Sequence, residues 1–219
     1  MNYELIKVCG MREAENIHLV EQLFGLHSSL FTFWMGFIFW PKSSRYVSEP
    51  PAYLPQKVKR VGVFVDASVE DICRHINDYK LDVVQLHGNE SPELICKLRS
   101  LCGDAIAIVK AFNIAAADDF EGTKPYEELV DYFLFDTKGK SVGGNGKKFD
   151  WSVLASYAGK TPFLLSGGIG PDDAEHLRAL RELDGFPVGK CLGIDLNSRF
   201  EIAPGLKDIH QLKTFLEQL

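Results

Sequence analysis

A carboxylate, several glycines and several lysines lie close together in residues 133–151, FLFDTKGKSVGGNGKKFDW. The segment begins as an apolar strand and ends that strand on Asp136, whose carboxyl group can transfer protons. The glycines that follow expose backbone N–H groups, which can approach phosphate oxygens, and the lysines add positive charge. The segment therefore fits proton transfer on a phosphorylated substrate. Considered alone, it fits a flexible surface loop with solvated charges equally well.

The elements that must position these groups alternate regularly along the chain. Apolar segments typical of buried strands recur about every 25 residues, and most are followed by a helical pattern. Eight such units in 219 residues, with no linker between them, predict one domain over residues 1–219. The alternation predicts a parallel sheet, so the fold class is α/β, a single (β/α)8 or TIM barrel. We expect strands at residues 5–9, 33–40, 60–65, 83–86, 105–111, 132–136, 163–166 and 191–195.

Two units depart from this alternation. Residues 48–56 contain Pro50, Pro51 and Pro55, and a proline inside a helix removes a hydrogen bond and clashes with the preceding turn. The helix after the second strand is therefore expected to be shortened or absent. The barrel wall would then be open there, and an exposed strand edge would favour a dimer. The helix after the fifth strand is poorly signalled, within residues 115–130.

The composition limits the classes of partner. Hydrophobic residues make up 46% of the chain and charged residues 25%, which is ordinary for a folded protein. The formal net charge is −6, which argues against a surface for nucleic acid or anionic membrane. The longest apolar run, residues 30–40, is too short to span a bilayer. A small-molecule substrate is the expected partner.

The five cysteines form no recognisable framework. Their number is odd and no two have the C-x-x-C spacing, which argues against a set of disulfides and against a zinc site. The first segment, MNYELIKVCG, carries an acid and lacks the apolar core of a signal peptide. We therefore expect free thiols, no metal and a cytoplasmic location. The choice between a monomer and a homodimer stays open.

A barrel of this kind places its catalytic groups at the carboxyl ends of the strands. Cys9 ends the first strand and Asp136 the sixth, so a thiolate and a carboxylic acid would face each other across the barrel mouth as base and acid. The thiol would need a lowered pKa, which Lys7 could favour. On residue type alone, Cys9 is better explained as a small buried apolar residue. Likewise, Asp136 could be a structural partner of Lys7 or Lys110.

Phosphate in such barrels is commonly held by the loops after the seventh and eighth strands, near a helix N-terminus. Here those loops read SGGIG and DLNSR, and the loop at residues 143–146 could close over the same group. That last loop matches neither the Walker A pattern nor G-x-G-x-x-G. Glycines that only form tight turns are the alternative. The candidate phosphate ligands are Gly167, Gly168, Asn197 and Ser198.

Three further polar residues lie at or after strand ends. Arg45 follows the second strand, and its guanidinium suits a substrate carboxylate, although a solvated loop arginine is the simpler interpretation. Gln85 and His87 lie at the end of the fourth strand and are weaker candidates for substrate contact, because a histidine there often bonds only the backbone. The histidines of this chain do not have the spacing of a metal-ligand set.

These residues fall in a series of motifs that run in order along the chain and read KVCGMRE, GFIFWPKSSRYVS, VGVFVD, VVQLHGNE, FDTKG, GGNGKKFDW, FLLSGGIGPDDA and GIDLNSRFEIAPGLKD. The motifs resemble those of phosphoribosylanthranilate isomerases, enzymes of tryptophan biosynthesis. The resemblance implies a (β/α)8 barrel that works without a cofactor. It implies an Amadori rearrangement of N-(5-phosphoribosyl)anthranilate to 1-(2-carboxyphenylamino)-1-deoxyribulose 5-phosphate.

The resemblance also implies a role for each candidate residue. Asp136 would be the general acid that protonates the furanose ring oxygen, and Cys9 the general base that removes the C2′ proton. Arg45 would hold the anthranilate carboxylate. Under this interpretation Cys9 and Arg45 are functional rather than structural. The residues that would bind phosphate are Gly144, Gly146, Gly167, Gly168, Asn197 and Ser198.

The chain departs from the family pattern in three places. Arg199 stands where the family usually has glycine, and it either adds charge to the phosphate site or disturbs the backbone there. Residues 26–33 look like an aromatic insertion, either a partner surface or extra packing. Residues 48–56 are shorter than the usual second helix.

Two other functions remain as alternatives. Another phosphate-sugar barrel, such as indole-glycerol-phosphate synthase or the isomerase of histidine biosynthesis, would share the phosphate loops, but the pair of Cys9 and Asp136 disfavours both. A catalytically silent barrel that only binds a phosphorylated ligand would account for Arg199 and the insertion.

Overall fold

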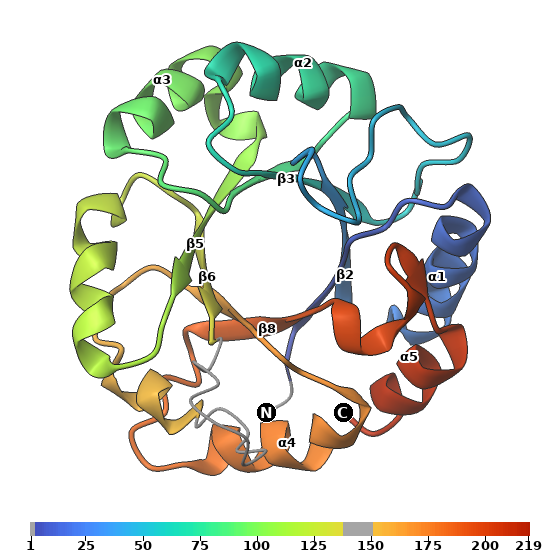
Figure 1. Cartoon of the computed structure of the whole chain (residues 1–219). Coiled ribbons are helices and arrows are strands. Elements are labelled where there is room, and N and C mark those ends of the chain that lie inside the picture. Colours follow the sequence, from blue (N-terminus) through green and yellow to red (C-terminus); the bar gives the residue numbers. More distant parts are fainter. Residues whose placement is uncertain (1–2, 138–150) are drawn as a thin grey trace.

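Eight parallel strands close into a barrel in the computed structural model, which describes residues 3–137 and 151–219. Each strand pairs with the next along the chain, and β8 pairs with β1 to close the sheet. Figure 1 shows the strands as an inner ring and the helices as an outer ring. The predicted (β/α)8 fold is confirmed. The strands are β1 (Leu5–Cys9), β2 (Thr32–Ile38), β3 (Lys59–Phe64), β4 (Val83–Leu86), β5 (Ala107–Asn113), β6 (Tyr132–Asp136), β7 (Phe163–Ser166) and β8 (Cys191–Leu196).

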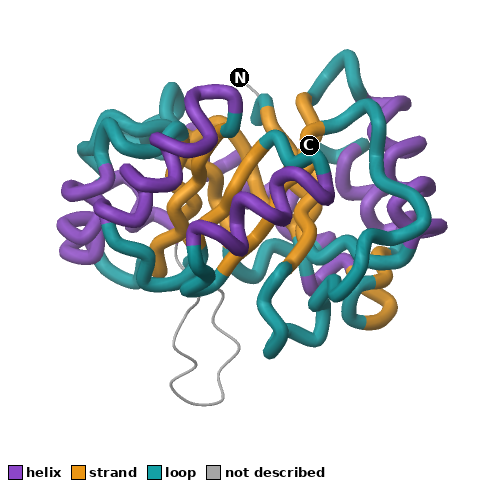
Figure 2. Tube along the Cα trace, turned by 90° about the horizontal axis from the view of Figure 1, so that it is seen from above, coloured by secondary structure: helices purple, strands orange, loops and turns teal. Residues whose placement is uncertain are grey.

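Helices surround the strands on the outside, as the view in Figure 2 also shows. No helix of the described residues is long and apolar enough to cross a membrane. A two-stranded hairpin, β9 (Glu201–Ala203) and β10 (Leu206–Lys207), follows β8. The α-helices are α1 (Ala14–His27), α2 (Val69–Tyr79), α3 (Pro92–Cys102), α4 (Ala174–Glu182) and α5 (Ile209–Leu216), and the 3₁₀-helices are η1 (Gly103–Ala105), η2 (Ala117–Tyr126), η3 (Trp151–Ser156), η4 (Pro171–Asp173) and η5 (Ser198–Phe200).

Local sequence signals account for the starts of α2 and α3 and for the irregular helix η2. Ser68 and Ser91 each accept a hydrogen bond from a backbone N–H in the first turn of α2 and α3. These caps satisfy donors that the helix itself leaves free. Residues 115–130 carried no clear helical signal, and they contain only the 3₁₀-helix η2 over Ala117–Tyr126, which includes Pro125. Proline has no N–H to donate, so a regular α-helix is disfavoured there.

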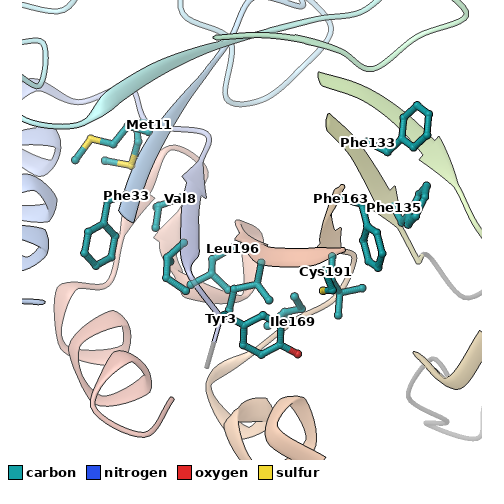
Figure 3. Close-up of a cluster of buried hydrophobic side chains, with 14 of the residues drawn as sticks. Tyr3, Val8, Met11, Phe33, Phe133, Phe135, Phe163, Ile169, Cys191 and Leu196 are labelled. Atoms are coloured by element: carbon teal, nitrogen blue, oxygen red, sulfur yellow. The ribbon is translucent and has the colours of Figure 1, made fainter. Parts of the chain in front are cut away.

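The strand side chains alternate between two apolar layers, because successive residues of a strand point to opposite faces. One layer contains only strand residues and therefore fills the inside of the barrel; it includes Leu5, Trp34, Val61, Leu134 and Leu164. The other layer lies between the sheet and its outer covering. Figure 3 shows part of it, including Val8, Phe33, Phe133, Phe135, Phe163 and Leu196. Residues at alternate strand positions are thus available for the interior, where a ligand can enter from one end.

The connection from β2 to β3, residues 39–58, contains no helix, as the prolines predicted. Tyr53, Leu54 and Val58 of this loop pack against the core in place of a helix. The expected open wall and exposed strand edge are wrong, because β2 is hydrogen-bonded to β1 on one side and to β3 on the other. The exposed-edge argument for a dimer is therefore removed.

A single carboxylate fixes this loop to α1. Glu21 is buried in α1, and its Oε1 accepts hydrogen bonds from the backbone N–H groups of Gln56 and Lys57, each at 2.6 Å. Its Oε2 accepts a hydrogen bond from the Tyr53 hydroxyl. The carboxylate thus satisfies two backbone donors of a segment that has no secondary structure of its own.

The aromatic residues between α1 and β2 serve packing. The rings of Phe24 and Phe33 stack with centroids 4.0 Å apart, and Phe31 lies edge-on to Phe33. All three rings are buried. Leu26 and Leu30 of the same segment are exposed, at 75% and 64%. The aromatic part of the expected insertion is therefore extra core, whereas its two leucines face outward.

We predict that Glu21→Ala lowers the free energy of unfolding by about 1–3 kcal/mol, because it leaves buried donors of the loop without an acceptor. The measurement is equilibrium denaturation in urea. Glu15→Ala is the matched control: Glu15 is exposed on the same helix and should cost less than about 1 kcal/mol. Equal losses in the two variants would contradict the proposed attachment of the loop.

Candidate active site

Polar residues near the carboxyl ends of four neighbouring strands lie side by side across the barrel. Asp136 of β6 is in register with Ser166 of β7, and Lys7 of β1 is in register with Asp195 of β8. The Ser166 hydroxyl donates to Asp195 Oδ2 at 3.2 Å, which joins the two pairs. Cys9 lies two residues beyond Lys7 on β1, so its side chain points to the same side of the sheet.

The strand ends surround a cavity of about 300 Å³, and Cys9 and Asp136 both line it. The acid and the base expected from the sequence therefore face one cavity at the carboxyl end of the barrel. Gly144 and Gly146, the two remaining candidates, lie outside the described residues. The other predicted residues that line the cavity are Arg45, Gln85, His87, Gly167, Gly168, Asn197 and Ser198.

The Cys9 thiol lies in a buried and charged environment. The Lys7 ammonium, itself buried, donates to Asp195 Oδ1 at 2.8 Å, and its charge acts on the thiol. Burial raises the pKa of the Cys9 thiol above its ordinary value; Asp195 adds to this, whereas Lys7 and Lys207 oppose it. The lowered pKa that the sequence interpretation required is therefore not found, because burial outweighs the cations.

Lys7 keeps its own charge in this environment. Burial alone would lower the pKa of the ammonium, but Asp195 and Cys9 favour the charged form more strongly, so the pKa is raised above its ordinary value. A protonated lysine at neutral pH is thus fixed beside the thiol. It is the strongest influence that stabilises a thiolate at this position.

Asp136 is buried at the end of β6, close to a histidine and a glycine. Its Oδ2 lies 3.7 Å from His87 Nε2, and Gln85 Nε2 lies 2.8 Å from His87 Nδ1. With the amide N–H as donor, Nδ1 accepts and the ring proton lies on Nε2, which faces the carboxylate. A Cβ on Gly167 would lie 2.8 Å from Asp136 Oδ1, and Gly167 has φ +102°, so this close approach requires glycine.

The structural partners considered for Asp136 are bound to other acids. Lys7 pairs with Asp195, and Lys110 pairs with Glu90 at 3.2 Å. Lys110 also donates to the carbonyl of Gly88 at 2.8 Å, and the Glu90 carboxylate accepts the Gly88 N–H. This second buried pair supports the loop after β4, which carries His87. An ion pair with Lys7 or Lys110 therefore does not account for the position of Asp136 at the cavity.

Arg45 reaches the cavity from the loop after β2, and it is not a solvated arginine. Its Nε lies 2.9 Å from both carboxylate oxygens of Glu201, and its Nη2 donates to Oε2 at 2.6 Å. Glu201 also accepts from Lys207 Nζ at 2.7 Å, and Lys207 donates to Asn197 Oδ1 at 2.9 Å. Despite burial, the two cations hold the pKa of Glu201 below its ordinary value. Two cations and one carboxylate leave one net positive charge here.

The two loops expected to bind phosphate lie on the same cavity. Gly167 and Gly168 have φ values of +102° and +68°, and both precede η4, which leads into α4. Ser198 begins η5, directly after β8. Backbone N–H groups in such turns can form a concave anion site, so the arrangement is compatible with phosphate at this rim.

Comparison with known proteins identifies the same family that the sequence motifs resemble. The sequence profile of a family described as N-(5'phosphoribosyl)anthranilate (PRA) isomerase matches residues 7–218. The chain belongs to this family. A protein of Parabacteroides distasonis named N-(5'-phosphoribosyl)anthranilate isomerase is 48% identical over 221 residues, covering 98% of this chain and 93% of that protein.

Solved structures of the family have the same fold. The phosphoribosyl anthranilate isomerase of Thermotoga maritima is 32% identical and superposes with a TM-score of 0.78, covering 98% of each chain. A second structure, 30% identical with a TM-score of 0.72, covers 98% of this chain and 97% of that one. It is described as a phosphoribosyl anthranilate isomerase in complex with reduced 1-(o-carboxyphenylamino)-1-deoxyribulose 5-phosphate.

Glu201 and Lys207 were not identified from the sequence, although they set the position of Arg45. They lie on β9 and β10, which have three and two residues and are too short to show strand periodicity. No other signal distinguishes them from solvated charges. Asp66, which follows β3, does not line the cavity; its Oδ1 accepts the Asn89 N–H at 2.6 Å.

Metal-ligating residues do not gather in the part of the chain that the structure describes, where no group of three or more His, Cys, Asp or Glu side chains could hold an ion.

We predict that removing the Lys7–Asp195 pair raises the pKa of the Cys9 thiol further. Lys7→Met combined with Asp195→Asn deletes one charge of each sign, and of the two Lys7 has the larger effect on the thiol. The measurement is a pH titration of the ultraviolet absorbance of thiolate, corrected with the same protein carrying Cys9→Ser.

The double variant is preferred because loss of one partner of a buried pair costs about 3–5 kcal/mol. Lys7→Arg keeps the positive charge and should change the thiol titration less. An unchanged or lowered thiol pKa in the double variant would show that Lys7 does not stabilise the thiolate.

Proposed function

We propose that this chain catalyses the Amadori rearrangement of N-(5-phosphoribosyl)anthranilate in tryptophan biosynthesis, without a cofactor. The observation that carries the proposal is that Cys9 and Asp136 line one cavity at the carboxyl ends of the strands. Membership of the PRA isomerase family supports the reaction. The roles of the individual residues are those that the family resemblance implies, and the position of these residues around one cavity supports them.

The reaction needs one proton donor and one proton acceptor. The Asp136 carboxylic acid gives its proton to the furanose ring oxygen, and the bond from that oxygen to C1′ breaks as the amine nitrogen forms a Schiff base. The Cys9 thiolate then removes the proton from C2′, which gives an enolamine that tautomerises to the ketone. His87 and Gln85, beside Asp136, contact the substrate or keep the carboxyl group oriented.

The two ends of the substrate are held by different walls of the cavity. Gly167, Gly168, Asn197 and Ser198 bind the phosphate, with Gly144 and Gly146 as further candidates from outside the described residues. Arg45 binds the anthranilate carboxylate. Its Nε and Nη2 donate to Glu201, which fixes the guanidinium at the wall of the cavity.

The remaining expectations concern the form of the protein. We propose that residues 1–219 act as one barrel domain, that the protein works in the cytoplasm, and that it is a monomer or a homodimer. The closed sheet and its continuous outer core support a single domain. Size-exclusion chromatography with light scattering decides the oligomeric state.

We predict that Cys9→Ser and Asp136→Asn each lower kcat/KM by about 10²–10⁴-fold, because a positioned base or acid contributes this much. The assay follows loss of the fluorescence of the substrate. Cys96→Ser and Asp118→Asn are the controls, since both residues are exposed and away from the cavity.

Near-normal turnover in either active-site variant would reject its assigned role. Complementation of a tryptophan auxotroph tests the function itself. A chain that binds the substrate in calorimetry but neither turns it over nor complements would be the catalytically silent barrel.

We predict that Arg45→Met raises KM about tenfold or more, whereas kcat changes less, because the lost contact is to a non-reacting carboxylate. Lys42→Met, an exposed cation of the same loop, is the control and should leave KM within twofold, about the size of a surface substitution. An unchanged KM in Arg45→Met would place the carboxylate elsewhere.

A further inference from the structure

Arg199 connects the two loops at the phosphate end of the cavity. It lies in η5, directly after β8, and lines the cavity together with Gly167 and Gly168. Its Nε and Nη2 lie 3.2 and 3.3 Å from the position that a Cβ on Gly170 would occupy. The guanidinium therefore extends from the loop after β8 to lie against the loop after β7.

The charge of Arg199 is not neutralised within the described residues. Two arginines line the cavity, and Arg45 is engaged with the Glu201 carboxylate at 2.6 Å. The structure records no ion pair or hydrogen bond from the Arg199 guanidinium to any other described residue, and Arg199 is exposed. Its N–H donors are thus available to an anion in the cavity.

Among the described residues, the other positive groups near the cavity are already occupied. Lys7 and Lys207 are buried behind the cavity surface, each bound to a carboxylate, and neither lines the cavity. The start of η4 is also occupied, because the Gly170 N–H donates to Asp173 Oδ2 at 2.8 Å. The helix end therefore offers an anion less than a bare N-terminus would.

We propose that Arg199 is the cation that binds the substrate phosphate and sets the affinity of this isomerase for its dianion. The proposal rests on the proposed function. Gly168, Ser198 and the backbone around them give the concave shape, and Arg199 supplies a charge-assisted, two-pronged contact from the rim. Arg199 is a binding residue and takes no part in proton transfer.

The test compares Arg199→Met, Arg199→Lys and the wild type. We measure KM and kcat for the phosphoribosyl substrate and the inhibition constant of inorganic phosphate as the probe. Arg199→Met should raise KM and the inhibition constant together by about tenfold or more, with kcat changed less than threefold, because a charged contact of this kind is worth about a factor of ten or more. Arg199→Lys should recover part of the loss.

The control is Arg74→Met, which removes the same charge from an exposed site on α2. It separates a local contact from a change in the net charge of the protein. A parallel rise in both constants for Arg199→Met alone, with partial recovery in Arg199→Lys, supports the proposal. Unchanged constants, or equal changes in Arg74→Met, overturn it.

Turnover by the wild type separates the role of Arg199 from the proposed function. If the wild type turns over the substrate and Arg199→Met keeps its KM, only the role of Arg199 is rejected. If the wild type shows no turnover, the proposed function is rejected. Binding of inorganic phosphate is then measured directly by calorimetry in place of the inhibition constant. Binding by the wild type that is lost in Arg199→Met would still support an anion site at this residue.

Discussion

The closure of the barrel between β1 and β8 is the constraint on which the cavity depends. The register of these strands places Lys7 beside Asp195, in the interior of the barrel. Removing two charges from water costs several kcal/mol per ion, so each is tolerated there only when the other is present. A shift of the β1 register by one residue would turn both Lys7 and Cys9 to the outer face of the sheet. The buried pair thus ties the position of the thiol to correct closure of the chain.

Buried ion pairs also support two loops whose side chains reach the cavity. Lys110 pairs with Glu90 below the loop that carries His87, and Lys207 pairs with Glu201 behind Arg45. In both cases burial lowers the pKa of the lysine, and the carboxylate opposes that shift. A buried cation needs a fixed partner, so each pair holds a loop in one arrangement. Loops that would otherwise be mobile therefore present their side chains from defined positions.

The sequence predicted the parts of this arrangement that leave a regular pattern. The strand β7 begins with the continuous apolar run Phe163–Leu165, and the residue after such a run, here Ser166, must lie at the mouth of a barrel. The partners of these residues could not be predicted, because Lys7 and Asp195 are 188 positions apart. The link from Arg45 to Glu201 depends on a hairpin too short to be recognised. Burial of Cys9, and hence the direction of its pKa, is likewise a property of the assembled barrel.

The raised pKa of Cys9 affects how much thiolate is present for the proposed reaction. Burial raises the pKa of the Cys9 thiol above its ordinary value, so the thiol form is favoured, whereas the proposed base is the thiolate. Under the proposed mechanism, any group that stabilises the thiolate enlarges the fraction of the protein that can remove the C2′ proton. Lys7 would then act on the rate through the charge it places near the thiol, although it does not itself line the cavity.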